Sequence, residues 1–280
     1  KKTPDEVLEL TRESVRLARR YADDVEFSAE DASRSDEDFL YRVLDTAIRE
    51  GATTVNIPDT VGYSMPLEFE QLIRNIRNNV ANIDKVIIAA HCHNDLGLGV
   101  ACSLAGVRAG VRQLECTING IGERAGNAAL EELAMALKTR GEFYGCDIGL
   151  DTRQLTRTSK LVSSLTGVEV QPNKAIVGQN AFLHQSGIHQ HGVLANRKTY
   201  QIINPEDVGV AKAEIVLGKL SGKHAFEEHL NEMGYHLTPE ELADAFNKFK
   251  TLCDRKKDVS DRDIEALLDK RISEIPDVYT

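Results

Sequence analysis

The chain has 280 residues, a length that suits one TIM-barrel-sized domain or two smaller domains. Hydrophobic residues make up 41% and charged residues 28%, close to the average of soluble globular proteins, which argues against a disordered or fibrous chain. The net charge of −10 disfavours a general nucleic-acid-binding surface, and no apolar run approaches the ~20 residues of a membrane-spanning helix.

The first half of the chain alternates between predicted strands and predicted helices. Strands are expected where β-branched or buried apolar residues gather, at 24–27, 53–57, 85–90 and 113–117. Helices are expected after a Thr3–Glu6 capping box, after Ser35 as an N-cap, and over 66–80, 97–109 and 127–140. The period of roughly 30 residues is that of a βα unit, so we expect a parallel sheet or barrel.

A polar and distinctive segment follows each predicted strand. The four segments are S-A-E-D (28–31), P-D-T (58–60), H-C-H-N-D (91–95) and N-G-I-G-E-R-A-G-N (119–127). Chemistry in parallel α/β folds takes place at the carboxyl ends of strands. Four such ends in register argue against ordinary loop polarity, and they predict a functional site there.

The pattern changes after about residue 150. An amphipathic helix is expected over 151–165, and residues 168–220 are irregular and rich in Gly, His, Asn and Gln. Further helices are expected at 221–233, from a second capping box at Thr238 to about residue 256, and at 260–270. We therefore expect a separate, mostly helical appendage.

His91 and His93 are two residues apart at the end of a predicted strand, which places them on one face. Two imidazoles on one face can bind one divalent metal ion. An H-x-H pair alone is weak evidence, because such histidines also pair structurally with neighbours such as Asn94 or Asp95. The strand-end position and the nearby Asn127 loop favour the metal hypothesis.

The segment 120–127 contains glycines in the pattern G-x-G-x-x-x-G. It resembles a phosphate-binding loop, but it matches neither the dinucleotide fingerprint nor the Walker motif. The glycines are better explained by a tight backbone turn. Asn127 can offer an amide oxygen to a metal, or it can simply cap the next helix.

Other candidates are less specific. Glu30 or Asp31 could act as a base, and Thr60 could donate its hydroxyl to an anionic substrate, but all three also suit solvated loops. The segment 186–192 carries His189 and His191 between glycines, and a mobile loop of this kind could reach an active site.

The five cysteines are scattered, odd in number and lack a C-x-x-C pair, which favours a reducing cytosol over a disulfide framework. The chain begins Lys1-Lys2-Thr3-Pro4, with no Met and no signal-type apolar segment, so residue 1 need not be the natural start.

Taken together, these motifs resemble the bacterial 2-isopropylmalate synthase family over residues 1 to about 270. The resemblance is carried by V-E-F-S-A-E-D (25–31), N-I-P-D-T-V-G-Y (56–63), A-H-C-H-N-D-L-G-L (90–98), E-C-T-I-N-G-I-G-E-R-A-G-N-A (115–128) and H-Q-S-G-I-H-Q-H-G (184–192). The H-x-H-N-D motif alone is shared with homocitrate synthase, citramalate synthase and metal-dependent lyases or aldolases of the same superfamily, which remain the alternatives.

The resemblance implies a Claisen-type condensation of acetyl-CoA with 2-oxoisovalerate, giving 2-isopropylmalate and CoA in leucine biosynthesis. It implies one divalent metal ion, with Mn²⁺ favoured over Mg²⁺ or Zn²⁺, and a cytoplasmic homodimer. The implied metal ligands are His91, His93 and Asn127. The implied catalytic residues are the acid–base pair Glu30 and His189, assisted by Tyr200 from the appendage. The implied substrate-side residues are Ser28, Asn56 and Thr60.

The implied fold class is α/β: strands five to eight of a TIM (β/α)₈ barrel, followed by a mostly helical appendage. The expected segments are a partial barrel at 1–150, a linker subdomain with the histidine loop at 151–235 and a helical subdomain at 236–280. The family's D-T-T-L-R-D-G motif, which carries an Asp ligand and a catalytic Arg, does not occur in this sequence. We therefore expect that the chain lacks the first barrel half and the leucine-regulatory domain, and that it does not turn over substrate alone.

Overall fold

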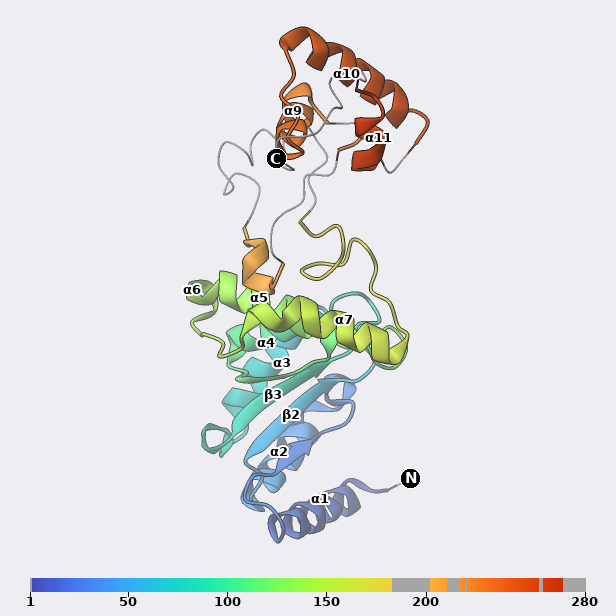
Figure 1. The fold of residues 1–280 in the computed structure, drawn as a ribbon. Helices are drawn as coiled ribbons and strands as arrows, with labels where there is room; N and C mark the ends of the chain where they lie inside the picture. Colours follow the sequence, from blue (N-terminus) through green and yellow to red (C-terminus); the bar gives the residue numbers. More distant parts are fainter. Residues whose placement is uncertain (1, 183–201, 211–216, 220, 257–258, 269–280) are drawn as a thin grey trace. The chain divides into compact units, whose positions relative to one another are not determined.

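The computed structural model describes residues 2–182, 202–210, 217–219, 221–256 and 259–268. The chain divides into two compact units, each described here by itself (Figure 1). The first comprises Lys1–Val170 with Ala175–Val177, and the second comprises Gln171–Lys174 with Gly178–Thr280.

The first unit is built around a four-stranded parallel sheet with the strand order β1-β2-β3-β4. Its strands are β1 (Glu26–Ser28), β2 (Thr54–Asp59), β3 (Ile87–Cys92) and β4 (Gln113–Glu115). Sequential order with a helix between neighbours is the βαβ arrangement. The predicted alternation of strands and helices is confirmed.

Seven helices belong to this unit: α1 (Pro4–Arg19), α2 (Glu37–Arg49), α3 (Pro66–Asn79), α4 (Gly99–Ala109), α5 (Leu130–Thr139), α6 (Gly141–Tyr144) and α7 (Leu155–Thr166). Single turns of 3₁₀-helix lie at η1 (Ala32–Arg34), η2 (Ile83–Lys85), η3 (Ile118–Gly120) and η4 (Thr152–Gln154).

The helix starts follow capping chemistry, with one correction. The Thr3 hydroxyl accepts from the Glu6 N–H while the Glu6 carboxylate accepts from the Thr3 N–H, so the predicted capping box is confirmed. Ser35 is not the N-cap of α2. Asp36 takes that position, and its carboxylate accepts from the N–H of Phe39 at 2.9 Å. A carboxylate also suits the positive end of the helix dipole.

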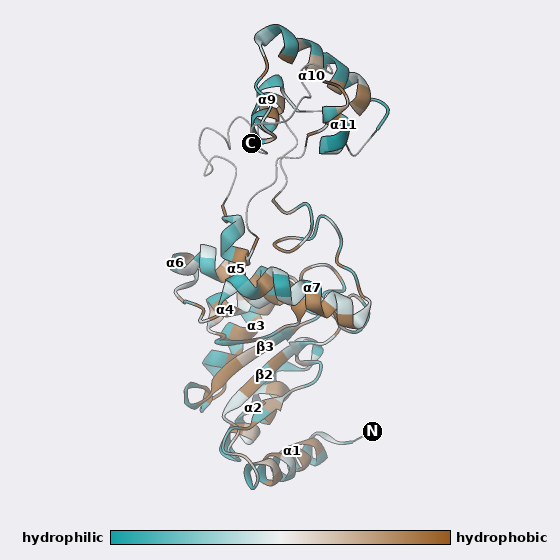
Figure 2. Cartoon of the chain, viewed as in Figure 1, coloured by the Kyte–Doolittle hydropathy of each residue, from teal (hydrophilic) through white to brown (hydrophobic). Residues whose placement is uncertain are grey.

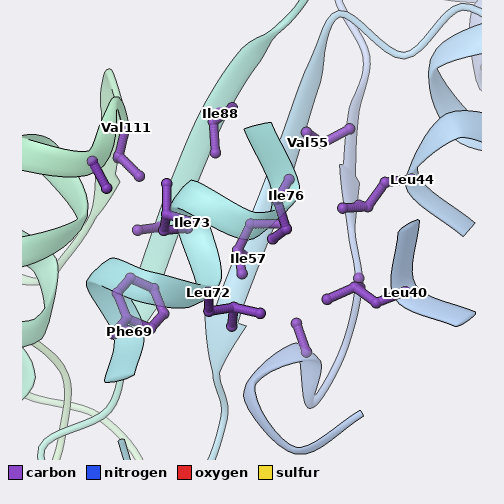
Figure 3. Packing of buried hydrophobic residues seen from close by; sticks show 14 of the residues in the cluster. Leu40, Leu44, Val55, Ile57, Phe69, Leu72, Ile73, Ile76, Ile88 and Val111 are labelled. Atoms are coloured by element: carbon purple, nitrogen blue, oxygen red, sulfur yellow. The ribbon is translucent and has the colours of Figure 1, made fainter. Parts of the chain in front are cut away.

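The two faces of the sheet differ in chemistry. Because side chains alternate along a strand, every second residue faces the helices. On that face Val55, Ile57 and Ile88 pack against α3 in the main hydrophobic core (Figure 3). In the hydropathy colouring β3 is largely apolar, whereas β2 alternates between hydrophobic and hydrophilic residues (Figure 2). The opposite face carries polar residues near the strand ends, including the bonded pair Ser28 and Asn56.

The second unit has its own core. It contains η6 (Pro205–Val208), α9 (Lys223–Glu232), α10 (Pro239–Cys253) and α11 (Asp261–Glu265). Phe226 of α9 stacks on Phe249 of α10 with ring centroids 4.8 Å apart, and both rings are fully buried. The predicted capping box between Thr238 and Glu241 is present. Among the described helices, none has both the length and the hydropathy needed to cross a bilayer.

Candidate metal centre

The polar face of the sheet gathers the predicted site residues at the strand ends. His91 of β3 is paired in register with Pro58 of β2 and Glu115 of β4, and Ser28 of β1 is paired with Asn56 of β2. Parallel strands end at the same edge of a sheet, so these side chains share one rim. The strand register therefore aligns the polar ends of neighbouring strands, as the prediction of a shared strand-end site requires.

His91 and His93 lie side by side, as their spacing predicts. Their Nε2 atoms are 3.2 Å apart, and their rings meet edge to face with centroids 4.9 Å apart. Two ligand nitrogens bound to one ion at about 2.1 Å would stand about 3.0–3.4 Å apart for octahedral to tetrahedral bond angles. The separation of the two Nε2 atoms fits a shared cation.

Asn127 lies next to His93 because the two residues form a β-bridge. Backbone hydrogen bonds hold this bridge, from Asn94 N–H to the Gly126 carbonyl at 2.9 Å and from Ala128 N–H to the Cys92 carbonyl at 3.0 Å. The Asn127 Nδ2 donates to the Ile121 carbonyl at 3.0 Å. Its Oδ1 is buried and accepts no hydrogen bond, so it is an acceptor that a cation would satisfy.

The alternative role of Asn127 as a helix N-cap is wrong. Helix α5 begins at Leu130, and its N-cap is Ala129. The chain between Asn127 and Ala129 is extended instead, because Ala129 bridges Thr117 in parallel fashion. Asn127 is thus held by strand-like pairing at the sheet rim.

The glycines of segment 120–127 serve close packing around Asn127. A Cβ at Gly122 would overlap the Asn127 Nδ2, and a Cβ at Gly126 would overlap the Gly120 carbonyl. Gly126 also has a φ of +85°, a left-handed conformation that glycine adopts without strain. The structure supports the tight-turn explanation of these glycines.

Arg124 ties three strand-end loops together. Its guanidinium donates to both carboxylate oxygens of Asp95, at 2.8 and 3.1 Å, and to the carbonyl of Thr60 at 2.8 Å. The hydrogen bond to Arg124 lowers the pKa of Asp95 below its ordinary value. Arg124 was not predicted as a site residue, although a lone Arg inside a glycine loop between H-x-H-N-D and Asn127 was a usable signal.

The substrate-side candidates occupy the same rim. The Ser28 hydroxyl accepts from the Asn56 Nδ2 at 3.1 Å, and the Thr60 hydroxyl accepts from the Asp31 N–H at 2.9 Å. Each hydroxyl therefore keeps its own proton for another acceptor. Glu30 follows β1 and is exposed, and among the described residues no hydrogen bond joins it to the histidine pair.

Glu115 is a site residue that sequence reasoning missed. Its Oε2 lies 3.3 Å from the Nδ1 of His91. Burial, together with a hydrogen bond to Glu26, raises the pKa of Glu115 to about 7. Alternation along β4 places Glu115 on the polar face, which was the available signal.

The electrostatics favour a neutral His91. Burial is the largest cause that lowers its pKa, and the neighbouring His93 lowers it further. A neutral imidazole keeps the lone pair that a metal needs. Among the described residues no group of three His, Cys, Asp or Glu side chains gathers as a metal site. His189 and Tyr200 lie outside the described residues.

Comparisons with known proteins cover both units. The sequence profile of the HMGL-like family matches residues 1–162, and that of the homocitrate synthase post-HMGL domain-like family matches residues 176–257. The 2-isopropylmalate synthase of Ruminiclostridium cellulolyticum is 63% identical over 279 residues, which are 100% of this chain and 55% of that protein. The corresponding enzyme of Aquifex aeolicus is 60% identical over 98% of this chain and 53% of its own length.

A further relative is shorter. The 2-isopropylmalate synthase 1 of Caldanaerobacter subterraneus is 57% identical over 98% of this chain and 69% of its own length. The chain spans about half the length of the first two relatives.

Proposed function

The chain belongs to the HMGL-like family and, within it, to the 2-isopropylmalate synthases, and from this membership we propose that it carries the metal centre for condensing acetyl-CoA with 2-oxoisovalerate to 2-isopropylmalate. The observation that supports this most directly is the pair of imidazole Nε2 atoms, 3.2 Å apart, together with the buried and unpartnered Oδ1 of Asn127, the residue that forms a β-bridge with His93.

His91, His93 and Asn127 would hold one divalent cation, for which the resemblance favours Mn²⁺; the amide oxygen suits Mn²⁺ or Mg²⁺, and the imidazoles also suit Zn²⁺. When bound, the ion would supply Lewis-acid polarisation of the keto group. All three donors are neutral, so they leave its positive charge available to an anionic substrate. Burial keeps His91 uncharged, which maintains that donor set at neutral pH.

The remaining rim residues have proposed roles at the substrate. The Ser28 and Thr60 hydroxyls keep a free proton that can be donated to a carboxylate, and Asn56 fixes Ser28 by its hydrogen bond. The methyl protons of a thioester are weakly acidic, so a base must be positioned near them. On the resemblance alone we assign acid–base work to Glu30 and His189, with Tyr200 assisting.

We also propose that β1 to β4 are strands five to eight of a (β/α)₈ barrel with a helical appendage. In support, β1 and β4 each pair on one side only among the described residues. An apolar groove of about 390 Å³ lies beside β4, lined by side chains such as Val111, Leu114 and Leu133. We further propose segment boundaries at residues 150 and 235. We also propose that the protein forms a homodimer and that it works in a reducing cytosol.

A chimera tests the function. Residues 1–280 would replace the matched segment of the R. cellulolyticum relative, and thiol release from acetyl-CoA would be measured with a panel of 2-oxo acids and Mn²⁺. We expect release with 2-oxoisovalerate that is lost in the His91→Ala chimera, and no release from the 280-residue chain alone. Preference for 2-oxoglutarate or pyruvate would contradict the assignment, and so would full activity of the His91→Ala chimera.

A further inference from the structure

The turn η3 and its C-cap residue Ile121 hold hydrogen-bond partners of Asn127. The Gly120 carbonyl accepts from the backbone N–H of Asn127 at 3.0 Å, and the Ile121 carbonyl accepts from its Nδ2 at 3.0 Å. The same carboxamide presents Oδ1, the atom proposed to face the cation. The position of these two carbonyls therefore helps to set where Oδ1 points.

Asn119, at the centre of η3, has a left-handed backbone. Its φ is +63° and its ψ is 6°, and Gly120 after it also has a positive φ of +67°. Side chains other than that of glycine rarely adopt this conformation, although asparagine tolerates it better than most. Such a conformation persists where the surrounding structure holds it in place.

Helix α7 and helix α5 provide those surroundings. The Asn119 Nδ2 donates to the Ser159 carbonyl at 3.1 Å and to the Ser163 hydroxyl at 3.3 Å, while the Ser159 hydroxyl donates to the Asn119 Oδ1. The Asn119 backbone N–H donates to Glu131 of α5 at 3.0 Å. Both ends of the Asn119 carboxamide are thus bound to α7, and the side chain of Ser159 is buried there.

These bonds have an alternative explanation, which is that they only dock α7 on the first unit. The segment that leads into α7 has other anchors, however. Thr152 of η4 is buried and its hydroxyl accepts from the Lys138 Nζ of α5 at 2.6 Å, and Leu155 at the start of α7 is buried as well. Docking of the helix therefore does not depend on Asn119 alone.

We propose that Asn119 is a positioning residue of the metal centre, which locks the turn that holds Asn127 onto α7. This inference rests on the proposed metal site, and it assigns Asn119 to the support of a ligand and not to the cation itself. It also gives α7, which the sequence pattern places in a separate appendage, a part in the framework of the site.

Zn²⁺ binding to the 280-residue chain, measured by isothermal titration calorimetry, tests the proposal. Zn²⁺ is used as the probe because it binds imidazole sites more tightly than Mn²⁺ does. Asn119→Gly removes the carboxamide but keeps a residue that adopts a positive φ without strain. We expect it to weaken binding by about 3–10-fold, as for a residue that acts on a site through its neighbours.

Ser159→Ala and Ser164→Ala form a matched pair on α7. Ser159→Ala removes the hydroxyl that binds Asn119 and should weaken Zn²⁺ binding, whereas Ser164 is exposed and its replacement should leave binding within about twofold. In the Asn119→Gly chain, Ser159→Ala should have no further effect, because the two residues act through one contact. Equal weakening by Ser159→Ala in both backgrounds would show a merely structural role and would overturn the proposal.

Hydrogen–deuterium exchange of the metal-free chain gives a second readout. Asn119→Gly should speed exchange at 120–128 and leave α7 protected. An equal loss of protection in α7 would mean that Asn119 only docks the helix, and the proposal would be wrong.

The failure of this proposal differs from the failure of the metal centre. If His91→Ala abolishes Zn²⁺ binding while Asn119→Gly binds like the parent, the positioning role alone is refuted. Equal Zn²⁺ binding by the parent and by His91→Ala would instead refute the metal centre itself.

Discussion

At the scale of single residues, the histidine pair followed from the sequence, whereas its surroundings did not. Alternation along a strand was enough to place His91 and His93 on one face. The start of α5 was misjudged because two alanines, which are good helix formers, follow Asn127. The β-bridge between Ala129 and Thr117 keeps residues 127–129 extended, and no local sequence pattern predicts such a bridge.

Gly122 is the residue where one methyl group should disturb the metal centre without removing a ligand. A Cβ there overlaps the Asn127 Nδ2, so Gly122→Ala must displace the amide that presents Oδ1. We expect Zn²⁺ affinity to fall by about tenfold, as for loss of an outer-sphere constraint. Gly149→Ala is the control, because a Cβ at Gly149 meets nothing within 4 Å. Parent-like affinity in Gly122→Ala would show that Asn127 is not a ligand.

At the scale of elements, the sequence predicts strands and helices better than the loops that join them. Buried apolar runs and capping boxes are local signals, so the four strands and the starts of α1 and α10 were found. The tie between three strand-end loops through Arg124 depends on the sheet bringing Asp95 and Thr60 together. The topology of the sheet decides such a contact, and no periodic pattern in the sequence indicates it.

Arg124→Ala should loosen all three loops together. Hydrogen–deuterium exchange should become faster at 60–63, 94–97 and 122–127, and Zn²⁺ affinity should fall. Arg153→Ala is the control, because Arg153 pairs with Asp151 only two residues away. Faster exchange confined to the loop of Arg124 would contradict the role as a tie.

The pH dependence of this effect follows from the pKa of Asp95, which the hydrogen bond to Arg124 lowers below 3.8. A depressed carboxyl pKa contributes stability that is present above the ordinary value and is lost only as the pH falls below it. The difference in the free energy of unfolding between the parent chain and Arg124→Ala should therefore be constant from pH 5 to pH 8.

At the scale of the whole molecule, the two compact units have separate hydrophobic cores. The change in sequence pattern near residue 150 anticipated a division of the chain. Helix α7 (Leu155–Thr166) nevertheless belongs to the first unit, where Asn119 donates to the Ser159 carbonyl at 3.1 Å. A hydrogen bond between residues so far apart in the sequence could not be foreseen from a change in composition.

Phe226→Ala should therefore unfold the second unit selectively. Phe226 is fully buried against Phe249, and truncating such a ring costs about 3–5 kcal/mol. Exchange protection should fall in α9 and α10 and persist in β2 and β3. Ile202→Ala, at a side chain that is 86% exposed, should change stability by less than about 0.5 kcal/mol. An equal loss of protection in β2 would mean that the units unfold together.

The central claim is that His91, His93 and Asn127 surround one divalent cation. Anomalous diffraction from crystals of the chain grown with Zn²⁺, recorded on both sides of the zinc absorption edge, tests it most directly. We predict one anomalous peak within bonding distance of both Nε2 atoms and of the Asn127 Oδ1. A peak elsewhere in the first unit, or no peak between the two histidines at saturating Zn²⁺, would contradict it.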